Sequence, residues 1–154
     1  MKDVNPQRHF QGCYASRAAT IGRGVQGRVV GFWITEGLHM QFTQQELDDL
    51  ISRAGTPQLS GSDLSSAKLS GRHLTGADLS SANLVNAYLD GAYLKNANLR
   101  GADLTGANLT NADLSGANLN NAKLVNAKLT RANLKGADLT DADLTGADLT
   151  GTEQ

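Results

Sequence analysis

Leucine occupies every fifth position from Leu59 to Leu149, nineteen times without an insertion. Alanine stands two residues before the leucine in sixteen of these units, the exceptions being Pro57, Ser62 and Arg72. A period of five fits neither a helix nor a continuing strand. Within a unit, however, alanine and leucine point to the same side of a short extended segment, and the Gly, Asn, Ser and Asp residues between the leucines favour turns. The pattern predicts a chain that coils around its own apolar axis.

The tandem A-[DN]-L-x-x units resemble the pentapeptide-repeat family over residues 57–151. The resemblance implies a mainly β fold, a right-handed parallel four-sided β-helix of slightly under five coils. The leucines and alanines would form its core. Arg72 takes the place of an inward alanine, where a buried, unpaired guanidinium would be costly. We therefore expect the coil to be irregular there and Arg72 to turn outward or to reach the preceding segment.

Four regions follow from the changes in composition. Residues 1–27 form a flexible basic segment, residues 28–56 a β-hairpin with a capping helix, residues 57–151 the repeat, and residues 152–154 a tail. The stretch RVVGFWITEGLHMQFT alternates in the manner of strands and predicts the hairpin over residues 28–42. We expect Phe32, Trp33 and Phe42 to pack against the helix or the first coil.

The capping helix is predicted over about residues 44–54. Thr43 and Glu46 have capping-box spacing, and an apolar stripe follows with Leu47 as its first member. Gly55 suits the C-terminal position, and Pro57 prevents continuation. Asp48 and Asp49, near the first turn, are interpreted as favourable helix charges rather than as a catalytic pair.

Two sets of outward residues are candidate protein contacts. Tyrosine and arginine are typical of interfaces, which suggests a surface made of Val85, Tyr88, Asp90, Tyr93, Lys95 and Arg100. A candidate basic ring consists of Lys123, Lys128, Arg131 and Lys135. The alternative interpretation is a charged surface that only keeps the coils in solution.

The two ends of the repeat are also candidate contacts. The last unit stops at GADLTGTEQ with no helix or aromatic residue to cover Leu144 and Leu149. A solenoid end needs a cap or a partner, so this coil is a candidate site of homo-oligomerisation. At the other end, Arg23 and Arg28 could contact a partner.

No chemistry of an enzyme is apparent in the sequence. GRGVQGRV at residues 22–29 matches G-x-G-x-x-G, but the required strand before it and helix after it are missing. His9, His39 and His73 form no metal-ligand pair with an adjacent Asp or Cys. We therefore expect no catalysis, cofactor, metal or small-molecule substrate.

Charge and hydropathy bear on the location of the protein and on its ligands. The 154 residues carry a net charge of −1 and one cysteine, Cys13. No apolar run reaches the roughly 18 to 20 residues that span a bilayer. We expect a cytoplasmic protein without a membrane span or a nucleic-acid ligand.

Three functions remain in competition. The first is a non-catalytic structural or protein-binding module that docks a protein of unknown identity. The resemblance also implies a second, because some family members mimic B-form DNA and bind type II topoisomerases. Residues 57–154 carry eight Lys and Arg against ten Asp and Glu, which is a weak field for such mimicry. The third is an end-on cap or self-assembling component of a larger complex.

Overall fold

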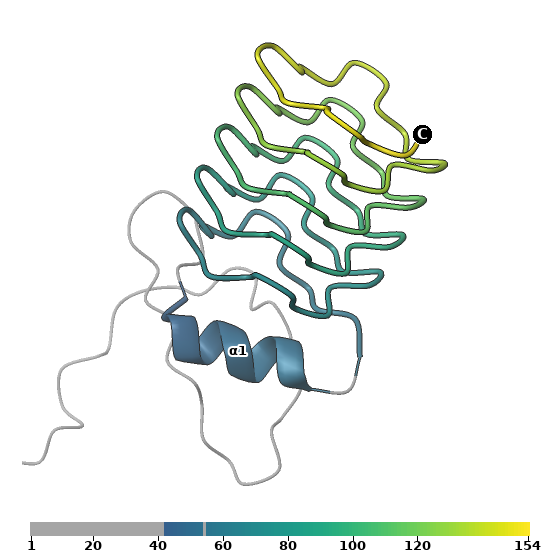
Figure 1. Cartoon of the computed structure of the whole chain (residues 1–154). Helices are drawn as coiled ribbons and strands as arrows, with labels where there is room; N and C mark the ends of the chain where they lie inside the picture. Colours follow the sequence, from purple (N-terminus) through teal and green to yellow (C-terminus); the bar gives the residue numbers. More distant parts are fainter. Residues whose placement is uncertain (1–41, 54) are drawn as a thin grey trace, which may run out of the picture. The chain divides into compact units, whose positions relative to one another are not determined.

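The computed structural model describes residues 42–53 and 55–154, which all belong to one compact unit (Figure 1). The basic segment, most of the hairpin, Arg23, Arg28, Phe32 and Trp33 lie outside the described residues. Phe42 is described, and it packs partly buried against the core as predicted.

Helix α1 spans Gln44–Ser52 and begins with the predicted capping box. The Thr43 hydroxyl accepts a hydrogen bond from the Glu46 amide at 3.3 Å, and the Glu46 carboxylate accepts one from the Thr43 amide at 2.9 Å. The predicted end at residue 54 is wrong, because Arg53 is already an extended C-cap. The Ser52 hydroxyl binds the carbonyl of Asp48 at 2.6 Å, and the chain then extends toward the first coil.

The repeat forms a stack of coils held by parallel bridges between residues twenty apart, from Gln58 with Asp78 to Asn133 with Glu153 (Figure 1). A bridge recurs every five residues, so each coil has four sides. We number the coils 1 to 5 as residues 57–76, 77–96, 97–116, 117–136 and 137–154. We name the faces after the residue that precedes the leucine: face A holds positions 58, 78, 98, 118 and 138; face B 63 to 143; face C 68 to 148; and face D 73 to 153.

Four backbone hydrogen bonds define each regular unit, as the one around Leu104 illustrates, and one of them runs from the Gly106 amide to the carbonyl of Val125 in the next coil at 2.9 Å. The Leu104 amide donates to the carbonyl of Lys123 in the next coil at 2.7 Å, and the Lys123 amide donates back to Ala102 at 2.9 Å. The Ala107 amide closes the corner by donating to the Leu104 carbonyl at 3.0 Å. The backbone at each corner adopts positive φ, which explains why Gly and Asn recur there.

The core is a column of leucines and alanines. Apart from the ends, these side chains are 0–3% exposed, including Leu109 and Ala107. Ser62 replaces an inward alanine in coil 1, and its buried hydroxyl has no hydrogen-bond partner among the described residues. In coil 5 the column is only partly buried, and Leu144 and Leu149 belong to this part.

We expect the corner glycines to differ in their tolerance of alanine. Gly106 and Gly136 have φ of 68° and 69°, so alanine at either position costs about 1 kcal/mol. A Cβ at Gly106 would in addition overlap the side-chain oxygen of Asn86, whereas one at Gly136 meets nothing within 4 Å. Because this oxygen ends a side chain that can rotate away, Gly106→Ala should lose only about 0.5 kcal/mol more than Gly136→Ala in urea unfolding.

The control for this difference is the double variant Gly106→Ala with Asn86→Gly. In the absence of the Asn86 side chain, the alanine at position 106 should lower the free energy of unfolding only as much as Gly136→Ala does. Equal losses for Gly106→Ala and Gly136→Ala in the otherwise unchanged protein would contradict the stacking of Asn86 over Gly106.

Candidate functional site

The contact between α1 and coil 1 accounts for Arg72. Its guanidinium lies 2.8 Å from the carboxylate of Asp48, so the expectation that Arg72 reaches the preceding segment is confirmed. The expected irregularity of the coil is wrong, because the Arg72 amide donates to Leu69 and its carbonyl accepts from Tyr93, as in the other units. Asp48 lies beyond the first turn, where Glu46 is the acidic residue, and its charge pairs with Arg72.

Gln44 pairs with coil 1 through its side-chain amide. The amide oxygen accepts from the Lys68 backbone N–H, and the amide nitrogen donates to the Lys68 carbonyl, both at 3.0 Å. The side chain thus replaces the peptide group that a preceding coil would supply. No sequence signal pointed to Gln44, since this pairing depends on how closely the helix approaches the coil.

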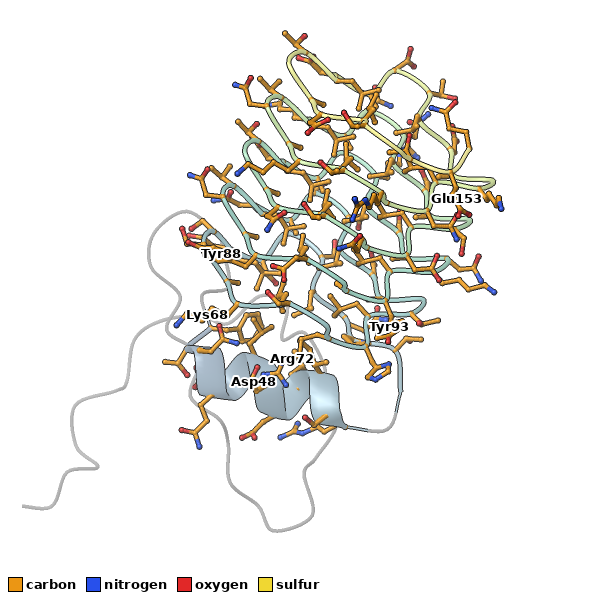
Figure 2. The ribbon with its side chains drawn as sticks, viewed as in Figure 1. Asp48, Lys68, Arg72, Tyr88, Tyr93 and Glu153 are labelled. Carbon is orange, nitrogen blue, oxygen red and sulfur yellow. The ribbon has the colours of Figure 1, made fainter. Side chains whose placement is uncertain are left out.

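Tyr88 and Tyr93 are the large hydrophobic side chains that the described residues leave exposed, at 50% and 47%. Tyr88 lies on face C between Lys68 and Asn108. Tyr93 lies on the adjoining face D and stacks on His73, with ring centroids 4.7 Å apart and planes at 5°. In Figure 2 Tyr88 and Lys68 lie to the left of the coils, and Tyr93 and Glu153 lie to the right.

The six residues predicted as one surface are distributed around the coils. Tyr88 lies on face C and Tyr93 on face D, Asp90 lies in the turn between them, and Lys95 lies in the turn that follows face D. Half-buried Val85 lies in the turn between faces B and C, and Arg100 lies in the turn that follows face A of coil 3. The six residues therefore do not form one compact contact, because the turn that holds Arg100 is on the opposite side of the axis from the turn between faces C and D.

Asp90 and Lys95 interact with residues of neighbouring coils. The Asp90 carboxylate accepts hydrogen bonds from the Ser70 hydroxyl at 2.8 Å and from the Asn108 amide at 3.4 Å, and these two contacts orient it. Hydrogen bonds from Ser115 lower the pKa of Asp113, and the charge of Lys95 lowers this pKa further.

The predicted basic ring encloses three sides of coil 4. Lys123 lies on face B, Lys128 on face C, Arg131 in the turn between faces C and D, and Lys135 in the turn that follows face D. Lys123 lies 3.6 Å from Asp103, and Lys135 lies 3.0 Å from Glu153. Within residues 42–53 and 55–154, neither Lys128 nor Arg131 forms an ion pair.

The register brings parts of both predicted sets to the same corner. Residues 88–95 and 128–135 are forty positions apart, which is two coils or about 10 Å along the axis. We call the surface that runs from face C across the turn between faces C and D to the turn after face D the C/D corner; it is formed by Tyr88, Tyr93, Lys95, Lys128, Arg131 and Lys135.

Aspartates in coil 5 have lowered pKa values. The Thr145 hydroxyl donates to the Asp143 carboxylate at 2.6 Å and the Thr145 amide donates at 3.0 Å, and these bonds lower the pKa of Asp143. The threonine two residues later lowers the pKa of Asp138 and Asp148 in the same way. Hydrogen bonds to the charged form favour ionisation.

We expect acid to destabilise the coils. A carboxyl whose pKa is lower in the folded state stabilises the fold above its unfolded pKa, about 3.9, and this contribution disappears as the pH falls through the folded value. The free energy of unfolding in urea should therefore be nearly constant from neutral pH to about 5 and fall below about 4. Replacing Thr140, Thr145 and Thr150 together by valine should make this fall shallower, and an unchanged fall would contradict the assignment.

Two kinds of site are absent from the described part of the chain. No group of three or more His, Cys, Asp and Glu side chains in it could hold a metal ion. No helix in it is long and apolar enough to cross a membrane.

Comparison with known proteins identifies the repeat. A model of pentapeptide repeats matches in eight copies over residues 58–96, 87–124 and 112–151. No curated protein matches the chain. Among solved structures, HetL, a pentapeptide-repeat protein involved in heterocyst differentiation regulation in the cyanobacterium Nostoc sp. strain PCC 7120, is 38% identical with a TM-score of 0.52. The match covers 62% of this chain and 52% of HetL, so the chain spans about half of HetL.

Two further structures are similar over more of their length. A pentapeptide-repeat protein of the Arabidopsis thaliana thylakoid lumen is 34% identical with a TM-score of 0.63, over 73% of this chain and 74% of that one. Rfr23 from the cyanobacterium Cyanothece 51142 is 38% identical with a TM-score of 0.52, over 66% and 67%. These neighbours imply a right-handed four-sided β-helix for residues 57–151, as predicted.

Proposed function

Because this chain belongs to the pentapeptide-repeat family, we propose that it is a non-catalytic scaffold that docks a protein partner on the C/D corner. The half-exposed rings of Tyr88 and Tyr93 are the observation that carries the proposal. Asparagine and aspartate predominate at the equivalent positions of coils 3 and 4, as at Asn108, Asp113 and Asn133. Tyrosine is enriched at interfaces because a large ring leaves water while its hydroxyl remains hydrogen-bonded.

The rigidity of the coils supports docking. The backbone at Tyr88 is held by Ala67 and at Tyr93 by Arg72, through hydrogen bonds of 2.9 and 3.0 Å. The stacking on His73 further restricts the ring of Tyr93. Side chains that are ordered before contact lose less conformational entropy on binding.

The test is capture of the partner from the native host by tagged variants. Tyr88→Asn and Tyr93→Asn place at each position a residue that the repeat uses elsewhere, so the coils should remain folded. Each should reduce capture at least about tenfold, the effect of truncating an interface hot spot. Arg100→Asn, a change of an exposed side chain in the turn between faces A and B, is the control and should leave capture intact. If both tyrosine variants retain the partner, the proposal is wrong.

The DNA-mimic alternative has less support from the charges. Coil 4 carries four cations and no carboxylate, and the coils together carry eight Lys and Arg against ten Asp and Glu. A protein that replaces DNA needs a strong negative field. We expect no effect of micromolar protein on gyrase supercoiling or its inhibition by quinolones, whereas protection would favour this alternative.

The alternative function as an end-on cap or self-assembling component depends on coil 5. Assembly would use the partly buried Leu144 and Leu149 and the acidic side chains of this coil. Light scattering at low and high salt separates this function from side-on docking. Monomers at every salt concentration would exclude assembly between copies.

A further inference from the structure

The outward charges of coils 1 to 4 are unevenly distributed around the axis. Faces C and D, with the turns that follow them, carry five cations that are not paired with α1, against Asp90 and Asp113: Lys68, Lys95, Lys128, Arg131 and Lys135. Faces A and B, with the turns that follow them, carry Arg100 and Lys123 against three carboxylates, Asp63, Asp78 and Asp103. The side with the exposed tyrosines is therefore also the more positive side.

Arg131 is the least expected of these cations. It adopts φ of 59°, a backbone conformation that arginine disfavours. The equivalent corners hold glycine or asparagine, namely Gly71, Gly91, Asn111 and Gly151. Arg131 is exposed and forms no ion pair with a described residue, so no electrostatic contact within the coils offsets its conformation.

We infer that the C/D corner binds an acidic polypeptide segment; the inference rests on the proposed docking function and specifies the chemistry of its partner. Carboxylates of the segment would contact Lys128 and Arg131, which no carboxylate of the described chain pairs with. An apolar side chain would lie on Tyr88 or Tyr93. The two groups of residues are two coils apart, about 10 Å, so three to four residues of extended chain would join them.

The segment would follow the axis rather than encircle a coil. On face C and the turn that follows it, coil 3 presents small uncharged side chains between Tyr88 and Lys128, namely Asn108, Thr110 and Asn111, whereas face D of the same coil carries Asp113. Such a surface lets an extended chain pass without a steric barrier. A path around coil 4 would instead meet Lys123, which already lies near Asp103.

The experiment is an NMR titration of the full ¹⁵N-labelled chain. The probe is a short blocked peptide in which glutamates flank one leucine, and its control has glutamine in place of each glutamate. We expect amide shifts in residues 88–95 and 128–135 with the glutamate peptide only. Binding should weaken at least about threefold when the ionic strength rises from about 0.01 M to about 0.15 M, because salt screens exposed charges.

Two matched variants of coil 4 separate this contact from general charge attraction. Arg131→Gly restores the residue type of the neighbouring corners, and it should weaken peptide binding about threefold while the urea midpoint of unfolding stays the same or rises. Lys123→Asn removes a cation from face B of the same coil and should leave the affinity unchanged.

Several results would overturn the inference. They are equal binding of the glutamine peptide, shifts confined to faces A and B, no shift at all, or a response to an oligothymidine strand but not to the peptide. If the tyrosine variants lose the native partner while the peptide gives no shift, the proposal that a protein docks on the C/D corner is supported, and the inference that the docked segment is acidic is rejected. If the tyrosine variants keep the partner, docking itself is wrong.

Discussion

Replacing Leu109 with alanine will lower the free energy of unfolding by about 3 kcal/mol. Leu109 is 0% exposed in coil 3, with Leu89 and Leu129 equivalent to it in the coils on either side. A column of leucines braced by backbone hydrogen bonds to both neighbouring coils cannot collapse into the space left by three missing carbon atoms. Urea unfolding followed by far-UV circular dichroism measures the loss.

Leu149→Ala is the matched control for this cavity. Leu149 occupies the same face in coil 5, where the core is only partly buried. The same truncation should cost about 1 kcal/mol or less there, because less apolar area is removed from contact. Equal losses at the two positions would contradict the described difference in packing.

Replacing Leu47 with alanine will detach α1 from coil 1, at a cost of about 2 to 3 kcal/mol. Leu47 is 2% exposed and is the fully buried side chain of this nine-residue helix. A helix this short is marginal without tertiary packing. Once α1 is released, Gln44 no longer accepts from the Lys68 amide, so hydrogen exchange at Lys68 should accelerate along with that of the helix.

The exchange experiment contains its own controls. The amide of Tyr88, which donates to Ala67 within the coils, should keep its protection in Leu47→Ala. Gln45→Ala changes an exposed side chain of the same helix and should leave Lys68 protected. If Lys68 stays protected in Leu47→Ala, α1 is not held by Leu47.

The core could be predicted because the spacing of the repeat determines it. Alanine and leucine two apart in a short extended segment must share a side, and nineteen repetitions leave one axis for them to pack around. The same reasoning identified Arg72 as an inward exception that must find a partner, and Asp48 is that partner.

The arrangement of the surface could not be read from neighbouring positions in the sequence. Val85 and Arg100 lie close to Tyr88 and Tyr93 along the chain. Because the chain bends between successive five-residue units, however, Val85 and Arg100 lie in the turns that follow faces B and A. Lys128 and Arg131 lie forty positions away and share the corner with the tyrosines. The residues of this surface are found by adding multiples of twenty to each outward position, which identifies its neighbours in the other coils, and not by grouping the outward residues of a single coil.

Details of the cap depend on contacts between elements, which local patterns do not encode. The capping box at Thr43 is a local signal and was predicted. The end of α1 at Ser52 and the pairing of the Gln44 amide with Lys68 depend on how the chain enters coil 1. Helix propensity alone therefore extended the helix too far.

The central claim is that a protein partner sits on the C/D corner, and photo-crosslinking in the native host tests it most directly. A photoreactive phenylalanine would replace Tyr88 in one protein, Tyr93 in a second and Arg100, in the turn between faces A and B, in a third. We predict the same crosslinked protein from positions 88 and 93 and none from position 100. Equal crosslinking at all three positions, or crosslinking at position 100 alone, would contradict the claim.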